Sequence, residues 1–135
     1  MIIVDTNVIG YLYLSSEHST KAEAALLRDP EWCAPLLWRS ELRNVLALYV
    51  RKKLLSLPDA HQIMDEAAQL MQGREYHVVS HQVLSLAAES TCSAYDCEFV
   101  ALAKDLGVGL VTTNKQILSQ FPDIAQSLHQ FTGES

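Results

Sequence analysis

Three acidic side chains, far apart in the sequence, occupy positions where they could act together. Asp5 ends the apolar run MIIV, Glu41 lies in the segment SELRNVL, and Asp96 lies in the segment SAYDCEFVALAKDLG. Two unit charges about 4 Å apart repel each other by roughly 4 kcal/mol at an effective dielectric constant near 20. If the three carboxylates meet, either their pKa values rise or a cation neutralises them.

Oxygen ligands with room for water are those that Mg²⁺ and Mn²⁺ prefer, and such sites activate water for in-line attack on phosphorus. The three acids therefore predict a divalent-metal site that cleaves phosphate esters. Each acid alone has a simpler explanation, because an acid early in a helix commonly caps the helix or interacts with its dipole. The prediction depends on the combination.

The segments that position these acids alternate between apolar runs and amphipathic stretches. The pattern predicts strands at about 1–4, 31–36, 75–79 and 109–113, and helices at about 6–14, 19–28, 37–54, 58–72, 83–88, 94–106 and 117–121. Strands that alternate with helices are typical of α/β domains. We expect a single domain over residues 1–135, with a three-layer α/β/α sandwich and a mainly parallel central sheet.

The predicted sheet explains why an apolar strand ends in a carboxylate. In open parallel sheets, ligands bind beyond the carboxyl ends of the strands, near the point where the strand order reverses. Asp5 lies at such an end, and Asn114 follows the second strongly apolar strand, in the stretch GLVTTN. These two residues are expected at the same edge of the sheet.

The overall charge argues against broad attraction to a phosphate backbone, because ten Lys and Arg residues stand against sixteen Asp and Glu residues, giving a net charge of −6. Half of the basic residues nevertheless fall between positions 39 and 53. They are Arg39, Arg43, Arg51, Lys52 and Lys53. This stretch is either a local basic rim for a nucleic acid or an ordinary solvated helix face.

The spacing of the cysteines and the hydropathy of the sequence indicate where in the cell the protein is expected. Cys33, Cys92 and Cys97 are widely spaced and odd in number, so they indicate neither a disulfide framework nor a zinc site. No charged region precedes an apolar stretch at the amino terminus, and no apolar segment approaches the roughly 20 residues that span a bilayer. We expect a cytoplasmic protein without membrane contact.

Four segments resemble, in order and spacing, the signature blocks of PIN domains, especially the VapC-type ribonuclease toxins of toxin–antitoxin pairs. They are MIIVDTNVIGYL, SELRNVL, SAYDCEFVALAKDLG and LVTTNKQIL, and together they span almost the whole chain. The resemblance implies Mg²⁺- or Mn²⁺-dependent cleavage of RNA by a metal-bound water, with metal-binding carboxylates at Asp5, Glu41 and Asp96. It also implies a homodimer and a cognate antitoxin whose tail blocks the site.

The resemblance assigns roles to further residues. Thr6 and Asn7 match positions whose side chains brace the site, and Thr112 and Thr113 match hydroxyl residues beside the last ligand. The fourth acidic position of the family is Asn114 in this chain. An amide oxygen can bind a metal or a water but adds no charge, so we expect weaker metal affinity and a poorly occupied second metal position.

Three functional hypotheses follow. The first is an endoribonuclease in which Asn114 completes the catalytic site, Arg39 or Arg43 approaches the substrate phosphate, and the products carry 5′-phosphate and 3′-hydroxyl ends. The second is a weak or inactive PIN-like module that binds RNA or a protein partner. The third, a phosphatase or receiver-like domain, is disfavoured because no second acid follows Asp5. Glu98 is expected at the surface, and the RNA target is not indicated.

Overall fold

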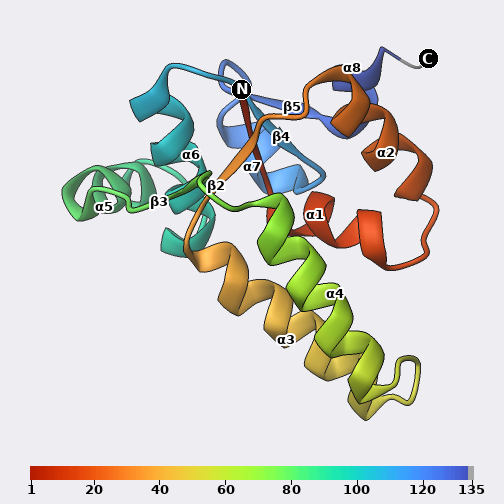
Figure 1. Cartoon of the computed structure of the whole chain (residues 1–135). Coiled ribbons are helices and arrows are strands. Elements are labelled where there is room, and N and C mark those ends of the chain that lie inside the picture. Colours follow the sequence, from red (N-terminus) through yellow and green to blue (C-terminus); the bar gives the residue numbers. More distant parts are fainter. Residues whose placement is uncertain (134–135) are drawn as a thin grey trace.

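The computed structural model describes residues 1–133 and is built around one sheet of five strands, all of them parallel (Figure 1). The strands are β1 (Ile2–Val4), β2 (Trp32–Pro35), β3 (Glu75–Tyr76), β4 (Leu110–Thr112) and β5 (Ala125–Ser127). Their order across the sheet is β3-β2-β1-β4-β5, with Ile3 of β1 opposite both Cys33 and Leu110. The predicted parallel sheet is confirmed.

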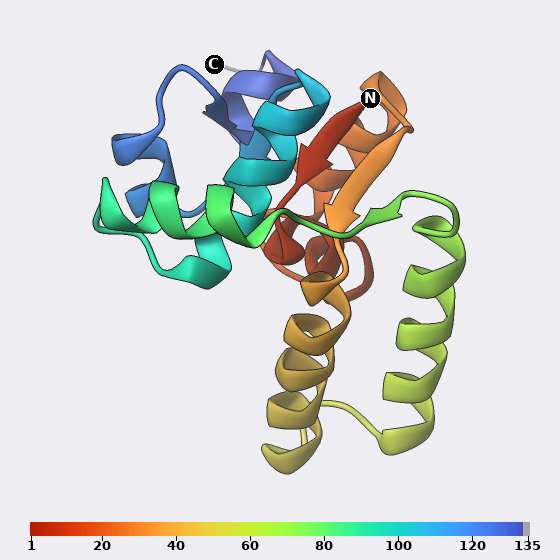
Figure 2. The ribbon, with the colours of Figure 1, turned by 90° about the vertical axis from the view of Figure 1, so that its left-hand side faces the viewer.

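Helices cover both faces of this sheet. They are α1 (Thr6–Tyr13), α2 (Ser19–Arg28), α3 (Leu37–Arg51), α4 (Leu57–Leu70), α5 (Ser80–Ala88), α6 (Ala94–Leu106), α7 (Lys115–Gln120) and α8 (Leu128–Thr132). Helix α6 packs on β1, β2 and β4 and carries α5, whereas α1 and α8 contact β4 and pack on α2 (Figures 1 and 2). The three-layer α/β/α arrangement is therefore confirmed.

The central strand shows why the apolar run forms as it does. All three residues of β1 are buried, because helices cover both faces of the sheet at that strand. The strand order reverses beside β1: the chain passes from β1 to β2 on one side, and β4 joins on the other side. The carboxyl ends of β1 and β4 therefore flank the topological switch point, where α/β proteins bind ligands.

Helices α3 and α4 pack against each other and project from the sheet as a hairpin (Figure 2). The first residues of α3 attach the amino-terminal end of this helix to β3. The indole N–H of Trp38, a fully buried residue, donates to Glu75 at 2.8 Å. The guanidinium of Arg39 donates to the same carboxylate through Nη2, at 2.6 Å, and through Nε. These bonds hold the amino-terminal end of α3 against the sheet.

Several boundaries differ from the sequence prediction. Helix α3 ends at Arg51, three residues early, because Lys53 adopts a left-handed backbone conformation with φ of 61°. Strand β5 and helix α8 were not predicted. The strand consists of the three residues AQS, which give no hydrophobic signal, and it forms by pairing with β4. No helix within residues 1–133 is long and apolar enough to cross a membrane.

Candidate active site

A cleft of about 210 Å³ opens at the switch point of the sheet. Its lining comes from the residue after β1, from α1, α3 and α6, and from the residue before α7. The lining residues are Asp5, Thr6, Asn7, Glu41, Asn44, Val45, Asp96 and Asn114. The structure therefore brings the three predicted carboxylates and Asn114 into one cleft, although 91 positions separate the first acid, Asp5, from the last, Asp96.

Asp5 is the innermost carboxylate of the cleft and is only 8% exposed. The hydroxyl of Thr112 donates to its Oδ2 at 2.7 Å, and the backbone N–H of Asn114 donates to that hydroxyl at 3.0 Å. Although Asp5 precedes α1, its side chain makes no capping hydrogen bond to the helix. Burial raises the pKa of Asp5, the hydrogen bond from Thr112 opposes this, and the charge of Asp96 adds to the rise.

Glu41 reaches the cleft from the second turn of α3 and is half-buried. The hydroxyl of Thr6 donates to its Oε1 at 2.7 Å. Burial raises the pKa of Glu41, and the hydrogen bond from Thr6 partly opposes this shift. Repulsion from Asp5 and Asp96 raises that pKa further, so the acids lie close enough to sense each other's charge.

Asp96 is the third residue of α6, and its neighbours leave its carboxylate free. Ser93 caps the helix, because its hydroxyl accepts a hydrogen bond from the backbone N–H of Asp96 at 3.1 Å. The carboxylate of Asp96 accepts no hydrogen bond from the other residues within 1–133. Since the cap is supplied by Ser93, the capping explanation does not account for an acid at this position, and the carboxylate is available to the cleft.

Asn114 lines the cleft, but its side-chain oxygen, which was expected to bind a metal ion or a water, accepts hydrogen bonds from the backbone instead. Oδ1 accepts the backbone N–H groups of Gln116 at 2.9 Å and of Ile117 at 3.1 Å, and so caps α7. The oxygen that was expected to complete the site is thus engaged at a helix terminus. The metal-ligand and catalytic roles of the four residues remain predictions.

The donors of the cleft match the preference of a hard divalent cation, because they are carboxylate oxygens of repelling groups. Threonines hold one oxygen each of Asp5 and Glu41, and among residues 1–133 the second oxygen of both carboxylates has no side-chain donor. Across the described residues, no group of three or more His, Cys, Asp or Glu side chains is arranged to hold a metal ion as it stands. The donor chemistry fits a divalent cation, although the three carboxylates do not surround a common point in this structure.

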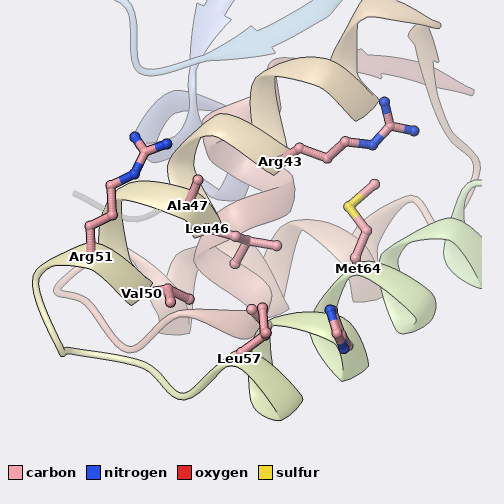
Figure 3. Close-up of a pocket in the computed structure, with 9 residues that line it drawn as sticks. Arg43, Leu46, Ala47, Val50, Arg51, Leu57 and Met64 are labelled. Carbon is pink, nitrogen blue, oxygen red and sulfur yellow. The ribbon is translucent and has the colours of Figure 1, made fainter.

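The two arginines that were expected near the substrate phosphate do not line the cleft. Arg39 is bound to Glu75, as described above, and this ion pair lowers the pKa of Glu75. Arg43 lies at a separate groove of about 450 Å³ between α3 and α4, where Figure 3 shows it extending toward Met64. The groove is otherwise mostly apolar, and Arg51 lies at its other end.

Sequence reasoning missed or misplaced other residues near the site. Asn44 lines the cleft and follows Glu41 by three residues, a spacing on one helix face that could have found it. Thr113 is absent from the lining and lies 3.1 Å from the Tyr11 hydroxyl. Glu98, which was expected at the surface, is half-buried at a neighbouring hollow, where burial raises its pKa.

The comparisons with known proteins agree with the fold. A family model described as "PIN domain" matches residues 2–124, so the chain belongs to the PIN-domain family. The chain is 29% identical to "Ribonuclease VapC3" of Pyrobaculum aerophilum over 124 residues, which is 90% of this chain and 95% of that protein.

Two crystal structures are similar to the fold. One is PAE2754 from Pyrobaculum aerophilum, with a TM-score of 0.77 and 17% identity over 98% of this chain and 93% of that one. The other is FitAcB from Neisseria gonorrhoeae, with a TM-score of 0.72 and 19% identity over 93% of this chain and 95% of that one. At these identities the two structures support the fold alone.

The hydroxyl of Thr112 gives a direct test of how Asp5 is held. Replacing Thr112 with valine keeps the shape but removes the donor to a buried carboxylate, so we expect a loss of about 2 kcal/mol in the free energy of unfolding at pH 7. Thr113→Val, which touches Tyr11 instead, is the matched control. Urea unfolding measures both variants, and an equal loss in the two would show that the Thr112 hydroxyl has no special role at Asp5.

Proposed function

We propose that this protein is a metal-dependent endoribonuclease, the toxin of a toxin–antitoxin pair. The observation that carries the proposal is the convergence of Asp5, Glu41 and Asp96 on one cleft at the switch point of the sheet. Membership of the PIN-domain family and the similarity to a protein named as a VapC ribonuclease support it.

The three carboxylates would hold Mg²⁺ or Mn²⁺, which supplies charge neutralisation and activation of water for attack on phosphorus. The residues of the chain have distinct tasks. Thr112 and Thr6 orient Asp5 and Glu41 through single hydrogen bonds, and the burial of Asp5 keeps its carboxylate out of bulk water. Cleavage by external water leaves 5′-phosphate and 3′-hydroxyl ends.

The partners follow from the same proposal. RNA is the substrate, a cognate antitoxin covers the cleft, and the protein forms a homodimer in the cytoplasm. The name of the relative, "Ribonuclease VapC3", supports RNA as the substrate. An alternative is a weak or inactive module that binds RNA or a protein partner. Two observations favour it: the side-chain oxygen of Asn114 caps α7, and no fourth acid lines the cleft among residues 1–133.

Incubation with a mixed RNA pool in Mg²⁺, Mn²⁺ or chelator tests the proposal. Wild-type protein is expected to cleave in either ion and to stop in chelator, since the repelling carboxylates need a cation to act together. Asp96→Asn is expected to cut at least about a hundredfold more slowly. Sequencing of the product ends should find 5′-phosphates and 3′-hydroxyls.

Asp105→Asn is the control for this experiment, because Asp105 is an exposed acid near the end of the same helix. It should cleave as the wild type does. Cleavage that survives both the chelator and Asp96→Asn would reject the proposal. Absence of cleavage alongside retained RNA binding would favour the inactive module.

A further inference from the structure

The cleft has no positively charged side chain in its lining among residues 1–133, although its proposed substrate is a polyanion. Arg39 is engaged with Glu75, and Arg43 belongs to the groove between α3 and α4. Polar contact with RNA inside the cleft must therefore come from the bound cation or from neutral donors. The neutral donors with amide groups are the side chains of Asn7, Asn44 and Asn114.

Asn7 and Asn44 both present exposed amide groups to the cleft, and Asn7 matches a family position whose side chain braces the site. Asn44 has no such role. It lies one turn beyond Glu41 on α3, and it is exposed in the cleft. Its carboxamide forms no hydrogen bond with another group of residues 1–133, unlike that of Asn114, whose oxygen caps α7. An amide N–H can donate to a phosphate oxygen without adding charge, and phosphate contacts position a nucleic acid without reading its sequence.

We propose that Asn44 is a substrate-binding residue that donates to an RNA phosphate next to the carboxylates. This inference rests on the proposed function and names a contact of the same cleft. Contact through a neutral donor leaves the negative potential of the three acids unopposed until a cation binds. RNA therefore binds after the divalent ion, and its affinity depends on that ion.

Two substitutions at this position separate contact with RNA from a role at the metal. Asn44→Ala removes the donor, and Asn44→Asp replaces it with a group of the same shape that repels phosphate. Contact with phosphate predicts weaker RNA binding by Asn44→Asp than by Asn44→Ala. A metal ligand at this position predicts the opposite, because a carboxylate would bind the ion more tightly than an amide.

The probe is a short fluorescein-labelled single-stranded RNA of mixed sequence. Steady-state cleavage in Mn²⁺ gives kcat and KM, fluorescence anisotropy gives the Kd for RNA, and calorimetry without RNA gives the affinity for Mn²⁺. We expect KM and Kd to rise about tenfold in Asn44→Ala and further in Asn44→Asp, with kcat nearly unchanged. The Mn²⁺ affinity of Asn44→Ala should equal that of the wild type.

Gln69→Glu is the matched control, because it adds the same single charge at an exposed amide of α4 outside the cleft lining. It should bind RNA as the wild type does. An unchanged KM and Kd in Asn44→Ala, or a fall in kcat alone, would overturn the inference. If neither the wild type nor any variant cleaves RNA but RNA affinity depends on Asn44, the proposed nuclease function is rejected and the proposed contact of Asn44 with RNA is supported. If RNA does not bind to the wild type at all, both proposals are rejected.

Discussion

Replacing Asp5 with asparagine is expected to reduce RNA cleavage by about a thousandfold and, at the same time, to stabilise the protein. Cleavage falls because the innermost charge of the proposed metal site is lost. Stability rises because Asp5 is a buried carboxylate next to other acids, and such charges oppose folding. We expect a gain of about 1 kcal/mol in the free energy of unfolding at pH 7, which raises Tm by about 4 °C.

The pH dependence of this gain follows from the direction of the pKa shift. The pKa of Asp5 is raised in the folded state, so the stability linked to its protonation is complete below the pKa of the unfolded chain. That stability is lost as the pH rises through the folded-state pKa. The advantage of Asp5→Asn should therefore vanish near about pH 3 and reach its full size at neutral pH, as measured by urea unfolding across the pH range.

Mn²⁺ provides the control for this prediction. A cation that binds the folded state stabilises it by mass action, so Mn²⁺ should raise the Tm of the wild type more than that of Asp5→Asn. A variant less stable than the wild type at pH 7 would show that the buried charge of Asp5 does not oppose folding. A variant that gains as much from Mn²⁺ as the wild type would show that Asp5 does not bind the ion.

Replacing Trp38 with alanine is expected to have the largest effect on folding. The indole is fully buried at the base of α3 and donates to Glu75. Loss of the ring leaves a cavity, which costs about 3–5 kcal/mol, and removes one donor from a carboxylate that also pairs with Arg39. Because α3 carries Glu41, RNA cleavage should also decline in the fraction of protein that remains folded.

Trp38→Phe separates the two contributions. Phenylalanine keeps most of the aromatic volume but has no N–H, so the loss should be about 1–2 kcal/mol. Chemical denaturation followed by far-UV circular dichroism measures both variants. Equal losses in Trp38→Ala and Trp38→Phe would show that the hydrogen bond to Glu75, and not packing, accounts for the role of Trp38.

The parts of the fold that the sequence predicted are those with strong periodicity or a clear terminus. The run Ile2–Val4 has the unbroken apolar pattern of a buried strand, and Gly107, which adopts φ of 67°, ends α6 where expected. The site was predictable in outline because the carboxyl ends of parallel strands share an edge. That rule placed Asp5 and Asn114 together without knowledge of any side-chain contact.

The rest depended on contacts between distant residues, which periodicity does not record. Strand β5 forms because β4 offers it an edge, and nothing in the letters AQS indicates it. Arg39 was interpreted as a substrate contact because of its charge, whereas Glu75, which binds it, is 36 residues away. Glu98 is only partly exposed because residues of α5 line the hollow beside it, and the start of α5 was predicted three residues late.

The double position of Asn114, at the cleft and at the start of α7, has an evolutionary consequence. Asparagine and aspartate cap helices about equally well, so exchanging one for the other leaves the fold almost undisturbed. Only the electrostatic character of the cleft would change. During evolution, a single substitution of asparagine by aspartate at this position can therefore change the affinity of the cleft for divalent ions without destabilising the fold.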